Sequence, residues 1–477
     1  MKTTKRLMSL LLILILIFSL SSCKSDKEKD GGKQVNGKKV SATDVTLPYS
    51  REDGVNPFTA QSLVNWTIMP LMYESPVTLD SNYKPVPCIA SEFSEGEDSV
   101  TIKLSDKKRF SDGSPVTGND IVYSFNLAKD SPFYRTALKS IESATSEFDG
   151  TVRFKLKKSN VFSAADLVFP VVKSGTAAEE MIPVGSGRYV YKRTEGGGML
   201  EMNTGSGWSG FHTKTIHLIN ESSSDSLLYS LSIGNVDAVF ENLAGGSPQR
   251  IVASTVQVPL NNLVIVDIKP DGVFKDPENR QALDSVIDRT KLISAGMDGY
   301  GVVSRYPFNP KWYGVKKKLP GKMEKKEASE RLKNKCRGRK YTILTNKDND
   351  YKVKTAEALS IQLKSAGVET EVSALPYDDY SKAAESGRYD FCIKEYKLTG
   401  DMDISFLVKG DEPEEIYSKV LSGKAPYEEF AKFYYGEMPF VTIGFRNGVL
   451  AYTRNIKGDV KVLPDNPLSN VENWNMA

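Results

Sequence analysis

Histidine and cysteine, the side chains that most often bind transition metals or act as nucleophiles, are scarce in this sequence. The chain of 477 residues has two His and four Cys. The cysteines, at positions 23, 88, 336 and 392, are far apart and form no C-x-x-C pair. One of them has a separate role described below, so three remain and we expect buried free thiols rather than a disulfide framework. Five positions separate His212 from His217, which places them on opposite faces of a strand, and we expect no metal or other cofactor.

Excess charge is also missing. The formal net charge is +3, and Lys2, Lys5 and Arg6 account for it. Without residues 1–22 the chain has 60 basic and 60 acidic side chains. A balanced surface produces no long-range field that would concentrate nucleic acid, so we expect no nucleic-acid partner. The basic run 333–340 follows a helix rich in both charges and is typical of a solvated face.

Sequence signatures of catalysis are absent as well. The chain has no G-x-S-x-G motif, no metal-ligand cluster and no Cys beside a His, so we expect no enzymatic activity. Its length exceeds that of one compact core and predicts at least two domains.

The N-terminal residues predict a signal peptide followed by a lipidated cysteine. An apolar run from Leu7 to Leu20 follows the basic start and is shorter than the roughly 20 residues of a membrane span. Residues 20–23, Leu-Ser-Ser-Cys, resemble the lipobox of bacterial lipoproteins, which implies that Cys23 carries the lipid anchor. Residues 23–44 are polar and Lys-rich and predict a flexible tether. An ordinary secretory signal and an uncleaved anchor helix remain the alternatives.

Strand-like and helix-like segments alternate through the rest of the chain. Residues 100–104, 151–156, 341–344, 368–375 and 389–393 read as strands. A helix capped by Asn119 or Asp120 and a second helix over 351–366, ended by Gly367, lie between them. This alternation favours an α/β fold with parallel neighbouring strands.

A series of motifs in a fixed order gives the strongest signal in the sequence. The block 90–125 runs through a strand to the turn Phe110-Ser-Asp-Gly-Ser-Pro115 and a helix opening with Asp120-Ile-Val. Further motifs follow the same order along the chain: Asn56-Pro57, residues 71–74, 183–189, 279–289, 356–368, Tyr389-Asp390 and 439–441. Together they resemble solute-binding protein family 5, the oligopeptide-, dipeptide- and nickel-binding proteins of ABC importers.

The resemblance implies a two-lobed α/β fold of the periplasmic-binding-protein-like (type II) class, with an extra subdomain in the first lobe. We expect the signal peptide over 1–22, the first lobe over 45–266 plus 438–477, and the second lobe over 267–437. The subdomain would span about 66–175, and hinge crossings would lie near 263–268 and 438–443. Ligand would bind between the lobes and favour their closed arrangement.

The family also implies where ligand would bind. Peptide-binding relatives clamp the peptide amine with an acidic residue shortly after a Trp, and here Tyr396 and Thr399 stand at those two positions. Asp401 or Asp403 could replace the acid if the loop is shifted. Arg305 could meet a carboxylate, and Tyr49 and Ser50 would line the cleft.

The expected function is capture of peptides or similar small solutes by an extracytoplasmic, lipid-anchored monomer that delivers them to ABC permease and ATPase subunits. A sensor or receptor lipoprotein of the same fold is the first alternative. A binder of a non-peptide solute, such as a metallophore, is the second.

Overall fold

The computed structural model describes residues 34–35, 38–39, 44–178, 182–245, 251–315, 321, 323–464 and 466–476. The predicted signal peptide and Cys23 lie outside the described residues. Within the predicted tether, β1 (Gln34–Val35) and β2 (Lys38–Lys39) form a short antiparallel pair. Among the helices that the structure describes, none combines the length and apolar character needed to span a membrane.

Buried apolar residues of the folded part, from residue 44 onward, form two large clusters. One, here called the first core, runs from Val45 to Trp474 and is built mainly from the first half of the chain. The other, the second core, is built mainly from residues between Leu263 and Phe445. Two separate cores agree with the expectation of two lobes, although the predicted lobe boundaries stay a prediction.

A mixed four-stranded sheet forms part of the first core. Its order is β10 (Tyr189–Thr194), β11 (Gly197–Met202), β12 (Thr215–Asn220) and β3 (Val45–Tyr49), with β3 parallel to β12. All five residues of β3 are buried, as expected for a strand that is covered on both faces. The helices α2 (Leu63–Met72) and α5 (Ser224–Ser232) and the short pairs β4 (Val77–Leu79) with β5 (Pro85–Pro87) and β20 (Ile456–Lys457) with β21 (Asn475–Met476) complete this part.

A second, fully antiparallel sheet also belongs to the first core and lies inside the predicted subdomain. Its order is β6 (Ala90–Glu95), β7 (Ser99–Leu104), β9 (Thr151–Leu156) and β8 (Ile141–Ser146). The antiparallel pairing corrects the expectation of parallel neighbours here. β7 and β8 do run in the same direction, as the connecting helix requires, but β9 folds back and inserts between them. The helical segments α3 (Gly118–Ala128), α4 (Arg135–Leu138) and η1 (Ser163–Asp166) accompany this sheet.

The start of α3 also differs from the prediction. Its N-cap is Thr117, and the predicted caps Asn119 and Asp120 lie inside the helix. Asp120 accepts hydrogen bonds from the Thr117 backbone N–H at 2.9 Å and from the Thr117 hydroxyl at 2.6 Å. This is a capping box, in which the acid three residues into the helix satisfies the cap residue.

The largest sheet extends from the first core into the second. Its order is β13 (Ala238–Glu241), β19 (Phe440–Tyr452), β14 (Ser254–Ile268), β18 (Phe391–Lys397), β16 (Lys340–Asn346) and β17 (Glu369–Leu375), and β15 (Gly301–Val303) also pairs with β19. Only β16–β17 and β16–β18 are parallel. Helices around the second core are α6 (Pro277–Val286), α7 (Arg289–Gly296), α8 (Lys325–Lys335), α9 (Asp350–Ser365), α10 (Tyr377–Glu385), α11 (Asp411–Leu421) and α12 (Tyr427–Glu437).

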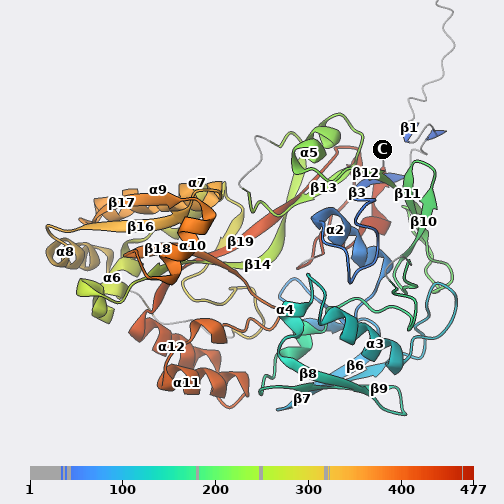
Figure 1. The fold of residues 1–477 in the computed structure, drawn as a ribbon, viewed down its shortest axis with the longest axis horizontal. Coiled ribbons are helices and arrows are strands. Elements are labelled where there is room, and N and C mark those ends of the chain that lie inside the picture. Colours follow the sequence, from blue (N-terminus) through green and yellow to red (C-terminus); the bar gives the residue numbers. More distant parts are fainter. Residues whose placement is uncertain are drawn as a thin grey trace, which may run out of the picture. The chain divides into compact units, whose positions relative to one another are not determined.

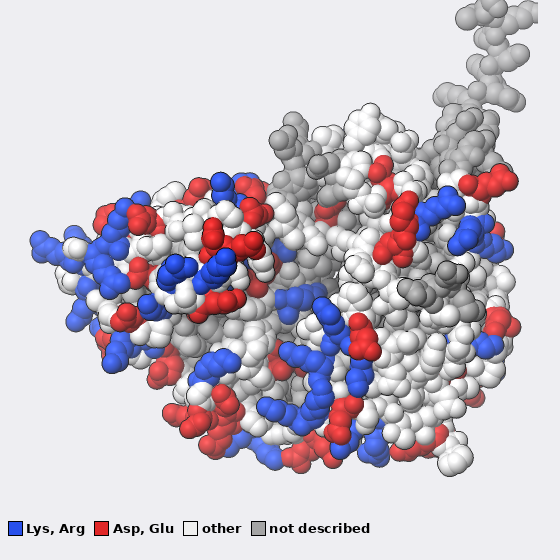
Figure 2. All heavy atoms as spheres, viewed as in Figure 1, with Lys and Arg blue, Asp and Glu red and all other residues white. Residues whose placement is uncertain are grey.

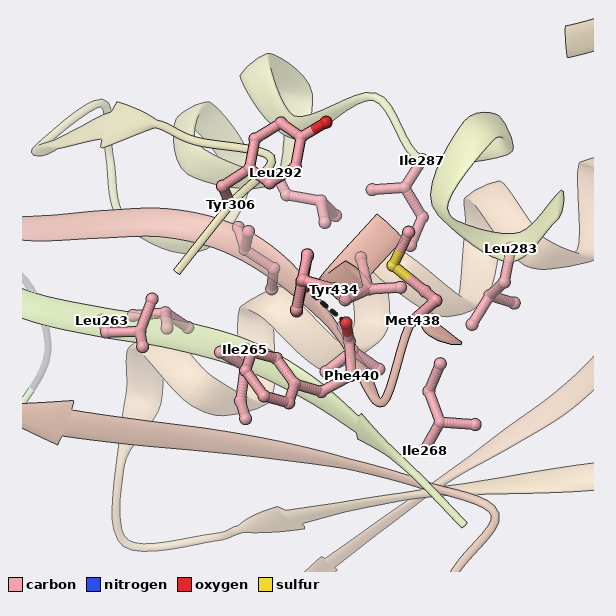
Figure 3. Packing of buried hydrophobic residues seen from close by; sticks show 14 of the residues in the cluster. Leu263, Ile265, Ile268, Leu283, Ile287, Leu292, Tyr306, Tyr434, Met438 and Phe440 are labelled. Atoms are coloured by element: carbon pink, nitrogen blue, oxygen red, sulfur yellow. Dashed lines mark hydrogen bonds between the residues drawn. The ribbon is translucent and has the colours of Figure 1, made fainter. Parts of the chain in front are cut away.

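The long strands β14 and β19 carry the chain from one core to the other (Figure 1). β14 contains the predicted hinge crossing near 263–268, and β19 begins within the other, near 438–443. The pairing of the two strands is irregular between Pro259 and Asn262 and between Val264 and Ile265. Figure 3 shows Leu263 and Ile265 packing among residues of the second core. There the Tyr434 hydroxyl donates a hydrogen bond of 2.6 Å to the Phe440 carbonyl, which fixes the start of β19.

Candidate ligand-binding site

The loop that follows β18 is held tightly against β14. The Leu398 N–H donates to the Asn261 carbonyl at 3.0 Å, and the Asn261 amide donates to the Thr399 carbonyl at 2.9 Å. Asn261 has φ +57°, a conformation that Asn tolerates better than most residues. The irregular part of β14 therefore determines where the loop 398–404 lies.

Asp401 is the central polar group of this loop and is only 1% exposed. Its carboxylate accepts hydrogen bonds from the Asn160 amide at 2.7 Å, from the Asp403 N–H at 3.1 Å and from the Thr399 hydroxyl. Asn160 lies in the predicted subdomain, so these bonds join the two cores. Gly400 lies so close to η1 that a Cβ would meet the Ala165 carbonyl oxygen at 2.5 Å, which explains the glycine at this position.

A second carboxyl group, that of Asp166 at the end of η1, faces Asp401. It is also 1% exposed, and among the described residues nothing donates a hydrogen bond to its Oδ1. Burial and the nearby charge of Asp401 raise the pKa of Asp166 well above its usual value. Burial and Asp403 also raise the pKa of Asp401, but hydrogen bonds from Thr399 and Asp166 oppose that rise.

A small pocket opens above these acids and has a basic and aromatic rim. Its cavity volume is about 20 Å³, and its lining includes Lys139 and Thr136 from the subdomain side and Lys397 and Phe406 from the other side. Lys139 and Lys397 are exposed, and Figure 2 shows Lys and Arg side chains gathered in the middle of the view, around α4. The pocket thus combines an acidic floor with cationic side chains at its mouth.

The predicted residues of the 396–403 segment come together at this pocket. Thr399, Asp401 and Asp403 line it, and the Tyr396 ring lies 5.1 Å from the Phe406 ring at its edge. Asp403 accepts hydrogen bonds from the N–H and hydroxyl of Ser405, which hold it in a turn.

The other predicted residues do not line this pocket. Tyr49 is buried in the first core with its ring 6.4 Å from Tyr191, and the Ser50 N–H donates to Asn65 at 2.7 Å. The carboxylate partner of Arg305 is Asp284, at 2.8 Å, and the guanidinium lies 5.6 Å from the Tyr435 ring. Their roles in ligand binding stay predictions, as does the role of Cys23.

The sequence did not predict four residues that line or support the pocket: Asp166, Asn160, Lys139 and Phe406. One signal was available for Asp166, because it is the only charged residue in the mainly apolar stretch 161–172. A lone acid in an apolar segment is buried at a cost unless it has a partner, and this predicts a role for it. No comparable sequence signal marks Asn160 or Lys139.

A larger hollow of about 290 Å³ lies elsewhere, between the end of α5, residues 252–253 and residues 453–454. Its lining mixes apolar residues with Ser232 and Thr453, and Arg454 is its charged residue. Because it offers one charge and no buried acid, it is a poorer candidate for binding a polar solute than the pocket at Asp401.

Comparison with known proteins identifies the class to which this fold belongs. The model of the bacterial extracellular solute-binding proteins, family 5 Middle, matches residues 84–408. The chain therefore belongs to solute-binding protein family 5, whose members serve ABC importers, and the predicted family and its type II α/β fold are confirmed.

Particular relatives are distant in sequence but alike over almost the whole chain. The oligopeptide-binding protein AppA of Bacillus subtilis is 22% identical over 99% of this chain and 98% of its own length. Unliganded MppA, a periplasmic murein tripeptide binding protein, has a TM-score of 0.74 at 16% identity, covering 92% of this chain and 98% of its own. NikZ of Campylobacter jejuni, in complex with Ni(L-His), has a TM-score of 0.62 at 17% identity, covering 91% and 100%. These relatives are binding proteins, and the family is extracellular.

Proposed function

We propose that this chain captures peptides with a free amino terminus and delivers them to ABC permease and ATPase subunits as a lipid-anchored monomer outside the cell. The main support for the proposal is the burial of the Asp401 carboxylate in the pocket. Asp401 lies in the loop where peptide-binding members of the family hold the peptide amine.

The chemistry of the pocket fits an ammonium group. In a pocket that excludes water, an ammonium gains charge-assisted hydrogen bonds from a fixed carboxylate such as Asp401. Thr399, at the expected position of the acid, instead donates its hydroxyl to Asp401 and orients it. The loop therefore offers the acid two positions later than the family pattern suggests, and Asp403 adds negative charge beside it.

The rim fits the rest of a peptide. Lys139 and Lys397 can attract a carboxylate, and the rings of Tyr396 and Phe406 offer an apolar face to a side chain. AppA and MppA are named for binding oligopeptides and a murein tripeptide. The nickel complex of NikZ keeps a metallophore as the alternative ligand.

Native mass spectrometry of the protein purified from its own host tests the ligand class. We expect co-purified peptides with free amino termini. A metallophore, or a neutral sugar, in their place would contradict the peptide proposal.

Substitution of Asp401 tests its role directly. Asp401→Asn removes the charge but keeps the shape, so we expect peptide affinity to fall by about 100-fold, the order seen when a charged hydrogen-bond partner is lost. The matched control is Asp130→Asn, which removes an exposed carboxylate of the same subdomain. Equal affinities of the two variants, measured by calorimetry, would assign ligand binding to another place.

The lipid anchor is tested by Cys23→Ala in the full-length chain. We expect the variant protein to appear in the soluble extracytoplasmic fraction, because stable attachment requires the acyl chains. Retention in the membrane fraction would contradict the anchor at Cys23.

A further inference from the structure

Asp166 reaches the pocket from the first-core side and meets Asp401 from the second-core side. Both side chains are almost fully buried, and both line the cavity. The Asp166 Oδ1 accepts no hydrogen bond from any described residue. A buried carboxyl oxygen without a partner loses its interaction with water and gains nothing in return, so the empty pocket presents an acceptor that a ligand can satisfy.

Two adjacent buried carboxyl groups hold one proton between them, because two negative charges in contact repel each other strongly at low dielectric. Burial and the charge of Asp401 favour the protonated form of Asp166, and Asp401 is the side-chain partner that it bonds. The titratable or charged groups facing the pair are Glu95 on β6, Asp403 in the loop, Tyr313, Tyr417 on α11, Tyr427 on α12, and Lys139 and Lys397 at the rim. The two lysines lie at the mouth of the pocket and have other contacts there: the Lys397 ammonium donates to the Leu260 carbonyl, and the Lys139 ammonium lies 5.8 Å from the centre of the Phe406 ring.

We propose that Asp166 and Asp401 form an exchange site in which the ammonium group of the ligand replaces the shared proton. On binding, the O–H bond of Asp166 breaks and its proton passes to solvent. The ammonium then donates hydrogen bonds to both carboxylates. Before the exchange, the two carboxyl groups and their shared proton carry a net charge of −1. After it, the two carboxylates and the ammonium group also carry −1, so the exchange buries no additional uncompensated charge. This inference rests on the proposed function, since it concerns the same pocket.

The dimensions of the pocket favour a primary ammonium. About 20 Å³ is room for one water-sized group, and –NH3+ is of that size. It has three donors, which match the free Asp166 Oδ1 and the Asp401 carboxylate. An acetylated amine has no charge to replace the proton, and a trimethylated one has no donor and exceeds the space.

The exchange makes binding depend on pH in a specific way. Where Asp166 is protonated in the empty protein and ionised in the complex, each bound ligand releases one proton. The affinity should then rise about tenfold per pH unit. It should level off and fall above about pH 8, where an α-amine loses its own proton.

Isothermal titration calorimetry with tetraalanine, at pH 6 in two buffers of different ionisation enthalpy, tests the exchange. Wild type should release about one proton per peptide. Asp166→Asn keeps a donor for Asp401 but cannot ionise, so it should bind tetraalanine with no proton release and a flat affinity between pH 5 and 7. Asp130→Asn should behave like wild type. N-acetyl-tetraalanine should bind at least 100-fold more weakly to wild type.

The outcomes separate this inference from the proposed function. If tetraalanine binds to wild type without proton release, or if Asp166→Asn still releases a proton, the exchange is wrong and the peptide proposal stands. If tetraalanine fails to bind wild type at millimolar concentration, both the proposed function and the proton exchange are wrong. A circular dichroism spectrum of Asp166→Asn equal to that of wild type shows that the variant is folded.

Discussion

Glu95, on β6, lies near the buried acids Asp166 and Asp401. Burial changes the pKa of its carboxyl group. Its carboxylate accepts a hydrogen bond from the Ala164 N–H at 3.1 Å. Burial nevertheless raises the pKa of Glu95 to about 7. Between the pKa of the unfolded chain, about 4.5, and pH 7 the folded protein therefore binds more protons than the unfolded one. Stability from this group is fully present below about pH 4.5 and is lost as the pH rises through 7.

Glu95→Gln removes this dependence and is our prediction at the residue scale. At pH 8 the variant should have a free energy of unfolding about 2 kcal/mol higher than wild type, less than the full change in pKa gives because Glu95 keeps some contact with water. At pH 4.5 the two should be equal. Urea denaturation at both pH values measures this, with the exposed Glu92→Gln on the same strand as control. An equal difference at both pH values would show that packing, not charge, causes it.

At the scale of elements, four segments meet in one buried charged network beside the predicted hinge. Glu395 on β18 accepts hydrogen bonds from Arg446 on β19 at 2.7 Å, Asn262 on β14 at 2.9 Å and Tyr351 on α9 at 2.5 Å. Arg446 also donates to the Asn242 carbonyl next to β13. Burial alone would raise the pKa of Glu395, but Arg446 and the hydrogen bonds outweigh it, and the pKa is lowered. The network therefore joins segments of both cores through an ionised pair.

Arg446→Met should destabilise the protein by about 3 kcal/mol, because it leaves the Glu395 charge buried without its partner. The double variant Arg446→Met/Glu395→Gln should recover most of that loss, since it removes the charge as well. Denaturant unfolding of the single and double variants measures the coupling. Lys354→Met, which breaks an exposed pair with Asp350, should change stability by less than about 0.5 kcal/mol. Additive effects of Arg446→Met and Glu395→Gln would contradict the coupling.

Individual helices and strands could be predicted from the sequence where neighbouring residues determine them. The helix predicted over 351–366 is α9, and Gly367 ends it with φ +86°, a conformation that glycine adopts at no cost. The strand predicted over 389–393 is β18, displaced to 391–397 because the polar residues after Ile393 continue the ladder with β14.

Only part of the candidate site could be predicted from the sequence. The loop 396–403 was located through its order among the family motifs, but the contact between Asn160 and Asp401 spans 241 positions and depends on how two cores pack. Pattern and propensity describe neighbours in sequence, so neither could bring Asp166 to Asp401.

At the scale of the whole folded part, the predicted subdomain and the second core share an interface. The Phe162 ring lies 4.9 Å from Trp312 and 5.6 Å from Tyr427, and the Val161 N–H donates to the Leu421 carbonyl at 2.8 Å. Tyr83 of the first half receives a hydrogen bond of 3.1 Å from Asn309. Val161 and Phe162 directly follow Asn160, whose amide donates to Asp401, so one short segment contributes both to this interface and to the support of the pocket.

Phe162→Ala should weaken this interface, because it removes an aromatic ring that packs at a tilted angle against Trp312 and Tyr427. We expect a loss of about 2–3 kcal/mol and a broadened thermal transition in calorimetry, since the two cores would unfold less cooperatively. The control is Phe148→Ala, which removes a fully exposed ring from the same subdomain. A single sharp transition in Phe162→Ala, at an unchanged temperature, would show that the interface adds nothing to cooperativity.

The pairing of β14 with β19 has a practical consequence for protein engineering. Asp267, where the chain enters the second core, lies opposite Phe440, where it returns. Paired residues of antiparallel strands have Cα atoms about 5 Å apart. Residues 268–439 are thus a cassette whose two ends meet at one point. They can be exchanged for the matching segment of a relative, or joined there to a fluorescent reporter, without rerouting the chain.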